Sequence, residues 1–98
     1  MNNYLSVFNV DVEKNDDIIT VTYYQKEYVG TCNYRRVTTK GLKKPIQQNF
    51  YVMETVNMDG VYEYLNLNGG LTEKDYEPIR MEIREHSLNM VKKHFPLN

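Results

Sequence analysis

The sequence predicts an α+β fold: an antiparallel sheet of four to five strands with one C-terminal helix packed on one face. Two observations predict this class. Residues 4–67 contain runs rich in Tyr, Val, Thr and Ile, separated by polar or glycine-containing breaks. Residues 73–94 carry apolar side chains at helical spacing, with acids at the start and bases at the end. We therefore expect strands over the first segment and a helix over the second.

The chain has the length of one domain, which we expect to span residues 1–98. Its 41% apolar and 26% charged residues are typical of a globular protein and exclude a disordered chain. No apolar run approaches the ~20 residues that a transmembrane helix needs. Cys32 is the only cysteine, which excludes an internal disulfide, and the chain does not open with a signal-peptide pattern. We expect a cytoplasmic protein.

The first two runs are expected to pair as an antiparallel hairpin. Residues 4–12 and residues 18–29 both alternate in side-chain character, and a polar turn separates them. Gly30 is expected to break the second strand or to introduce a bulge, because glycine weakens the interior of a strand. Residues 34–39 are expected to form a short third strand, and residues 41–45 a loop that glycine and proline bracket.

A second hairpin is predicted around the Asp59-Gly60 dipeptide. Residues 50–57 and 61–67 flank it, and both runs contain residues that favour strands. Asp-Gly between two such runs is a common hairpin turn. A helical spacing of apolar residues also spans residues 46–57, so the sequence leaves a helix there as an alternative to the strand.

The C-terminal helix has signals at both ends. Thr72 is the expected N-cap, acids follow it in the first turns, and basic residues occupy the last turn, as the helix dipole favours. Pro78 lies close enough to the start to be tolerated. At ~100° per residue the apolar side chains form two stripes. One stripe contains Tyr76, Ile79, Ile83, Met90 and Val91, and the other contains Met81, Leu88 and Phe95.

Charge is segregated along the chain, although the net charge is only -1. Residues 28–53 contain five basic residues and no acid, and aromatic residues lie among them. Basic side chains neutralise phosphates and aromatic rings stack on bases, so this segment is a candidate contact for nucleic acid or another anion. The alternative is that the segment pairs with the protein's own acids. The candidate contact residues are Tyr34, Arg35, Arg36, Lys40, Lys43 and Lys44.

The nine tyrosines are the second functional signal. A sheet with one helix leaves its other face uncovered, and tyrosine is enriched at protein interfaces. The alternative is that tyrosine replaces the missing tryptophan in the core. Acidic and tyrosine side chains alternate in the predicted second hairpin, which indicates a surface for a basic partner. The candidate partner-binding residues are Glu54, Asp59, Tyr62, Glu63 and Tyr64.

No residue pattern points to catalysis, a metal or a cofactor, so we expect a protein that is not an enzyme. Glu82 and His86 are spaced for a helical pair that could bind a divalent ion or act as a base, but a solvated helix surface is the simpler interpretation. Cys32 lies near two arginines, which would lower a thiol pKa. A small buried side chain is the simpler interpretation there.

We therefore expect a small protein-binding module that docks its acidic, tyrosine-rich surface on another protein. The chain has no alanine and eleven asparagines, a composition of AT-rich genomes that fits a phage or mobile-element inhibitor of a host protein. The first alternative is a nucleic-acid-binding protein that uses the basic segment 34–51. The second is an oligomeric structural component of a phage particle. A homodimer is a further expected form of partner.

Overall fold

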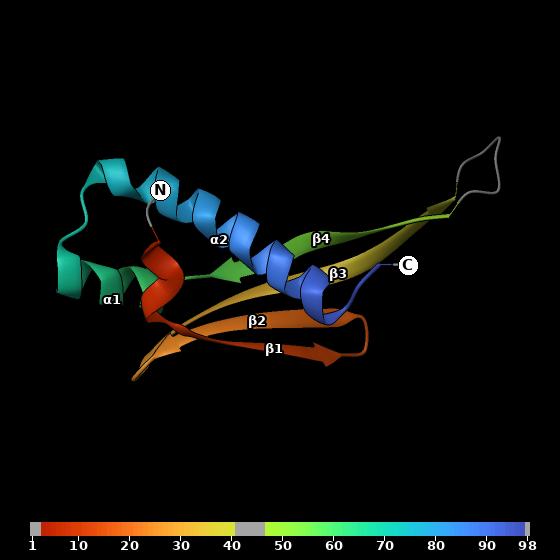
Figure 1. The fold of residues 1–98 in the computed structure, drawn as a ribbon, viewed down its shortest axis with the longest axis horizontal. Coiled ribbons are helices and arrows are strands. Elements are labelled where there is room, and N and C mark those ends of the chain that lie inside the picture. Colours follow the sequence, from red (N-terminus) through yellow and green to blue (C-terminus); the bar gives the residue numbers. More distant parts are fainter. Residues whose placement is uncertain (1–2, 41–46, 98) are drawn as a thin grey trace.

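The structure is a computed structural model that describes residues 3–40 and 47–97 (Figure 1). Its elements are the 3-10 helix η1 (Tyr4–Val7), β1 (Asn9–Asn15), β2 (Ile18–Gln25), β3 (Tyr28–Lys40), β4 (Gln47–Asn57), α1 (Asp59–Gly69) and α2 (Glu73–His94). The four strands form one antiparallel sheet in the order β1-β2-β3-β4. The predicted α+β class is confirmed, with four strands and with a second helix that the sequence did not predict.

The first hairpin is confirmed, but its strands have other limits than predicted. β1 begins only at Asn9, because residues 4–7 coil into η1 and bury Leu5. The expected strand over residues 18–29 is two strands. The chain reverses at Lys26, which takes a φ of 54°, and continues as β3. A residue in this left-handed region gives a two-residue turn the twist that the flanking strands require.

Strand β3 continues without interruption through Gly30, where a break or a bulge was expected. Gly30 lies inside β3, opposite Tyr23, and the irregularity falls between Asn33 and Tyr34, where β4 has the extra residue Glu54. Residues 50–57 belong to β4, so the helical alternative for this run is wrong over the part of it that the structure describes. The predicted loop at 41–45 lies outside the described residues.

Residues 61–67 form α1 and not a strand, which corrects the second predicted hairpin. The reason is a close approach of backbones. A Cβ on Gly60 would lie 2.3 Å from the Val29 carbonyl oxygen, and a Cβ on Gly30 would lie 2.6 Å from Val61 Cγ2. Gly60 is therefore not a turn residue but the point at which the first turn of α1 contacts β3. Val61 is completely buried there, which favours the helix more than local strand propensity opposes it.

The C-terminal helix is confirmed as α2. Thr72 and Asp75 form a capping box, in which the Thr72 backbone N–H donates to Asp75 Oδ2 at 2.8 Å. The helix buries one row of residues at intervals of four: Ile79, Ile83, Ser87 and Val91. Tyr76 and Met81 of the predicted stripes are 46% and 60% exposed. Figure 1 shows α2 crossing one face of the sheet.

Three tyrosines on adjacent strands connect the sheet to α2. The Tyr23 hydroxyl of β2 lies 2.6 Å from His86 Nδ1, and the Tyr34 hydroxyl of β3 lies 2.5 Å from Ser87 Oγ. The Tyr51 hydroxyl of β4 donates to the Phe95 carbonyl at 2.6 Å. Burial raises the pKa of Tyr23, so its hydroxyl keeps its proton in this hydrogen bond with His86. These tyrosines therefore fill and position the core, as the alternative interpretation of the tyrosines predicted.

The glycine contact gives a matched pair of substitutions. Gly60→Ala is expected to lower the free energy of unfolding by about 2 kcal/mol, because the new methyl group must displace α1 from the Val29 backbone. Gly69→Ala, with no atom within 4 Å of its added Cβ, is expected to raise it by about 0.5 kcal/mol through helix propensity. Urea denaturation measures both. Equal effects of the two substitutions would contradict the contact.

Asp75 makes the stability depend on pH. The Thr72 backbone N–H, followed by the Tyr4 hydroxyl, holds the pKa of the Asp75 carboxyl below its ordinary value. The ionised form therefore stabilises the fold fully above the ordinary pKa of about 4, and this is lost as the pH falls through the lower folded-state pKa. The difference in unfolding free energy between wild type and the less stable Asp75→Asn is expected to be largest near pH 7.

The difference in unfolding free energy between wild type and Asp75→Asn should narrow as the pH falls below about 4. Asp11→Asn is the control, because Asp11 is exposed on β1 and makes no hydrogen bond from its side chain within the described residues. Denaturant titrations at several pH values measure the difference. A gap that stays constant between neutral and acid pH would show that the Asp75 carboxylate does not hold the helix start.

Candidate functional site

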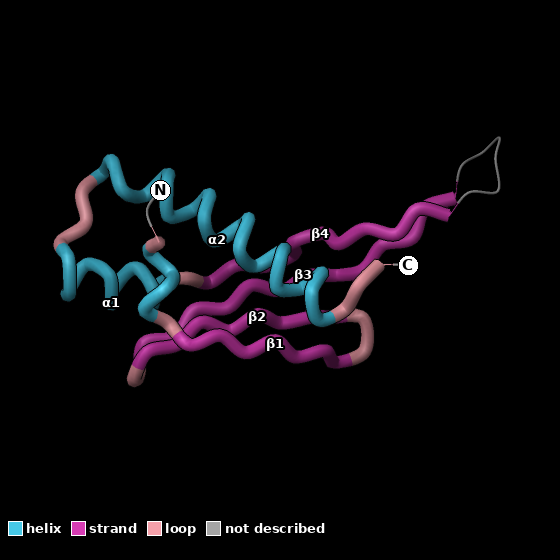
Figure 2. Tube along the Cα trace, viewed as in Figure 1, coloured by secondary structure: helices cyan, strands magenta, loops and turns pink. Residues whose placement is uncertain are grey.

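The basic segment extends from the sheet as a two-stranded ribbon. The last residue pair between β2 and β3 is Ile18 with Arg35, whereas β3 and β4 stay paired out to Lys40 and Gln47. Residues 36–40 and 47–51 therefore pair only with each other, and we call these residues the ribbon. Figure 2 shows this part of β3 and β4 passing beyond the β1–β2 turn, on the side of the molecule away from α1.

The two faces of the ribbon differ in chemistry. Opposite residues in an antiparallel pair point to the same side, and sides alternate along each strand. Arg36, Thr38 and Asn49 share one side with Tyr51, which is the side that α2 covers further along the sheet. The Thr38 hydroxyl donates to Asn49 Oδ1 at 2.7 Å across this side. Phe50 lies on the other side and is 40% exposed.

The predicted contact residues for nucleic acid are not equivalent. Tyr34 is 2% exposed and bonded to Ser87, so it is a core residue, because alternation turns it toward α2. Arg35 forms an ion pair with Glu54 and is partly neutralised. Arg36 is exposed and has no ion pair within residues 3–40 and 47–97. Lys40 ends β3, and Lys43 and Lys44 lie outside the described residues.

The predicted acidic, tyrosine-rich surface is divided. Glu54 lies on β4, whereas the other four residues lie on α1, where consecutive positions are ~100° apart. The Tyr62 ring packs against Tyr76 of α2 at 5.4 Å between centroids. The Tyr64 ring packs instead against Phe8, at 5.3 Å. Because both rings are half-buried and contact different elements, they do not form the single exposed face that a strand would have given.

A groove between β4, α1 and α2 was missed in the sequence. It has a volume of about 490 Å³, and its apolar lining includes Met53, Met58 and Ile83. Arg80 and Arg84 line it from α2, and Asp59 is the one acid in its lining. The two arginines are spaced i, i+4 on a helix, which places them on one face. The i, i+4 spacing of the two arginines was the signal of this site in the sequence, but only the fold brings β4 beside them.

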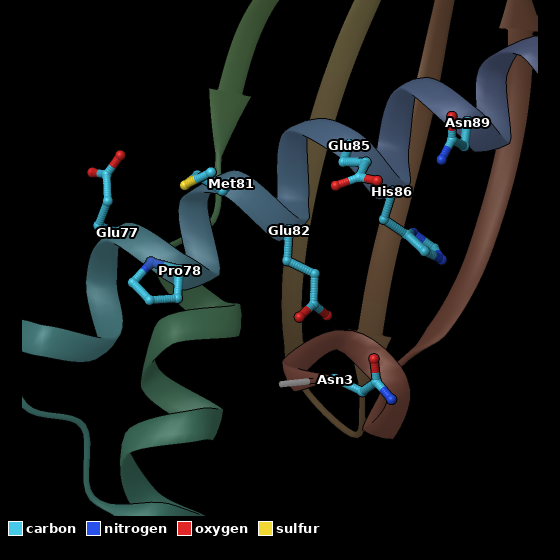
Figure 3. A pocket seen from close by; sticks show the side chains of 8 residues that line it. All are labelled: Asn3, Glu77, Pro78, Met81, Glu82, Glu85, His86 and Asn89. Atoms are coloured by element: carbon cyan, nitrogen blue, oxygen red, sulfur yellow. The ribbon is translucent and has the colours of Figure 1, made fainter. Parts of the chain in front are cut away.

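A second cavity, of about 440 Å³, lies along the solvent side of α2 next to Asn3 (Figure 3). The predicted Glu82–His86 pair lines it. Glu82 accepts hydrogen bonds from the backbone N–H groups of Tyr4 and Leu5, at 3.0 and 2.7 Å, and His86 Nδ1 is hydrogen-bonded with the Tyr23 hydroxyl. Both side chains thus make structural contacts. The Glu82 carboxylate holds η1 against α2 by accepting hydrogen bonds from the backbone amides at the start of η1.

Within the described residues, no three His, Cys, Asp or Glu side chains gather in a way that could hold a metal ion. No helix in the same part of the chain combines the length and apolar character needed to cross a membrane. No protein-family model, no curated protein and no solved structure is detectably similar to this chain. The site must therefore be argued from its own residues.

Cys32 is completely buried in the centre of the sheet, as the simpler interpretation predicted. Burial raises the pKa of its thiol to about 11, although a hydrogen bond with Ser87 opposes the shift. Arg35 does not activate it, because Arg35 points to the opposite side of the sheet and pairs with Glu54.

The Cys32 thiol is expected to resist an aromatic disulfide reagent at pH 8 in the folded protein, because it is protonated and shielded from solvent. It should react fully once urea unfolds the chain. The release of the coloured thiol measures the rate in each state. Rapid labelling of the folded protein, at the rate of the unfolded one, would contradict the buried position.

Proposed function

We propose that this protein binds nucleic acid and that the ribbon is the element that contacts it. The observation that carries the proposal is the separation of charge. Residues 36–51 contain four basic residues and no acid, and the ribbon projects past the first hairpin. Arg36 lies beyond the last pair of β2 with β3, is exposed, and has no ion pair within the described residues, although the net charge of the chain is -1.

The shape of the ribbon supports duplex DNA as the ligand. The major groove of B-DNA is wide enough for a two-stranded β-ribbon. Arg36 and Asn49, on one side of the ribbon, have the side-chain types that contact phosphates and base edges there. Tyr51 fixes the base of the ribbon to the end of α2 through the Phe95 carbonyl. A ribbon held at its base enters a groove with less loss of conformational entropy than a free loop.

The sequence favoured docking on another protein through an acidic, tyrosine-rich surface. Asp59, Tyr62 and Glu63 of that surface share one face of α1, whereas Tyr64 packs against Phe8 and Glu54 lies on β4, paired with Arg35. The residues of the ribbon include Arg36 and Lys40 and no acid, and we therefore rank nucleic-acid binding first. The inhibitor role and the phage origin remain predictions from composition.

Arg36→Glu is the sharpest test, because Arg36 is exposed and unpaired in the described residues, whereas Arg35 is held by Glu54. The measurement is fluorescence anisotropy with a 20-base-pair duplex and a single strand of the same length, over a series of salt concentrations. We expect the duplex affinity of wild type to fall steeply with salt. Arg36→Glu should weaken duplex binding about tenfold and reduce the salt slope by ~1.

Lys74→Glu is the matched control. It makes the same charge change at an exposed position in the first turn of α2, at the opposite end of the helix from the contact between Tyr51 and Phe95. Its effect on duplex affinity should be small compared with that of Arg36→Glu. The proposal fails if wild type shows no salt-sensitive binding to either ligand, or if the two substitutions weaken binding equally. Tighter binding to the single strand would reject the major-groove geometry.

A further inference from the structure

The outer edge of β4 is open and poorly protected. β4 ends the sheet, so the backbone groups on its outer side have no strand partner within the described residues. Soluble proteins usually guard such an edge with charges, proline or a very short strand. β4 has eleven residues, no proline and one charged residue, Glu54, which Arg35 neutralises. The opposite edge, β1, is shorter and carries Asp11, Glu13 and Lys14.

The side chains of β4 are unusually apolar for an edge that faces water. Phe50, Val52 and Val56 are 40%, 40% and 49% exposed, and they lie on one strand. A partner strand added to this edge would cover them while it satisfied the free backbone groups. Addition of an extended segment to a sheet edge is a common form of peptide recognition, in which pockets for alternate side chains provide specificity.

The groove between β4, α1 and α2 supplies such a pocket beside the edge. Met53 and Val56 of β4 line it together with Ile83 of α2, so an apolar side chain of an added strand has a place to enter. The extra residue at Glu54 interrupts the ladder at this point. Continuous pairing is therefore expected along residues 48–53, with the groove at the end of the paired stretch.

The charge of the groove indicates the chemistry of the partner. Arg84 is exposed and has no ion pair within the described part of the chain, and Arg80 is paired only with the exposed Glu77 at 2.5 Å. Asp59 is the one opposing charge in the lining. The lining is thus cationic above an apolar floor, and it complements a strand that carries an apolar residue and acids.

A polypeptide fits this surface better than the other two occupants. Unpaired N–H and C=O groups alternate along a strand edge, and only another strand offers both donors and acceptors at that spacing. Nucleic acid offers acceptors along its backbone but no matching donors. A second copy of β4 would bring Glu54 as its single acid, and Arg35 already holds that side chain.

We propose that the β4 edge and the Arg80–Arg84 groove bind an extended, acidic segment of a partner protein as a fifth strand. Residues 48–53 pair with the backbone of the segment. Met53, Val56 and Ile83 receive one of its apolar side chains, and Arg80 and Arg84 pair with its carboxylates. The paired stretch includes residues 48–51 of the ribbon, whereas the groove with Arg80 and Arg84 is separate from Arg36, the exposed cation on which the nucleic-acid proposal rests.

The test uses a display library of random twelve-residue peptides, selected on the folded full-length protein. Wild type should enrich peptides in which apolar residues alternate and Asp or Glu is over-represented. The double variant Arg80→Glu/Arg84→Glu should lose these peptides or reverse their charge preference. The control Lys74→Glu/Lys93→Glu makes the same charge change at exposed positions outside the groove and should retain them.

A selected acidic peptide is then used as a defined probe. Its affinity for Arg80→Glu/Arg84→Glu should be weaker than its affinity for wild type by a factor of about ten or more, a change of ~1.4 kcal/mol or more. Amide hydrogen exchange should show new protection within residues 48–53 when the peptide is bound. Circular dichroism and urea denaturation establish that both double variants are folded. Arg36→Glu should bind the peptide as wild type does, whether or not the protein binds nucleic acid.

Five outcomes would overturn the proposal. The first is that the selected peptides show no acidic preference, and the second is that the groove variant binds them as well as the control does. The third is that new protection of amide hydrogens appears away from β4. Sedimentation of the protein alone shows a dimer that the peptide dissociates, which would assign the edge to a second copy. A nucleic-acid duplex displaces the peptide and loses affinity for the groove variant, which would assign the groove to nucleic acid.

Discussion

The structure depends on the position of α2, and three tyrosine hydroxyls fix that position. Tyr23, Tyr34 and Tyr51 come from three neighbouring strands, and their hydroxyls meet α2 at His86 and Ser87 and the chain just beyond it at Phe95. A buried hydroxyl without a partner would cost about 1–3 kcal/mol, so sliding the helix along the sheet is unfavourable at several points at once. The row of Ile79, Ile83 and Val91 contributes apolar burial between these anchors. Together they place the long helix on one face and leave the rest of the sheet uncovered.

The second constraint is the close contact between α1 and β3. Gly30 and Gly60 remove the side chains that would hold the two backbones apart, and Val61 and Met58 fill the space. This contact sets α1 next to the end of β4 and thereby forms the third wall of the Arg80–Arg84 groove. A strand over residues 61–67 would have covered the outer edge of β4. The helix leaves that edge open, and the open edge is the basis of the peptide-binding proposal.

The two proposals share residues 48–51 of β4, but they use different groups: nucleic acid would contact side chains of the ribbon, and an added strand would pair with the outer backbone edge. The ribbon beyond the first hairpin contains basic residues and no acid, and its Arg36 has no ion pair within the described residues. Closer to the helices, Arg35 and Glu54 neutralise each other, and the groove arginines come from α2 instead. Ligands at the two places would therefore respond to different substitutions. The same separation explains how a chain of net charge -1 presents two cationic surfaces.

The sequence by itself determined much of the local structure: the first hairpin, the helix over 73–94 with its Thr72 cap, and the segregation of charge along the chain. These features follow from neighbouring side chains, through alternation, capping and the helix dipole. The tertiary structure decided the identity of residues 59–69, because strand propensity there was weaker than the burial of Val61 against β3. It also divided the predicted tyrosine surface, buried Tyr34 and brought Arg80 and Arg84 beside β4. These outcomes depend on contacts between residues far apart in the chain, and a pattern read along the chain contains no information about which distant segment will pack against it.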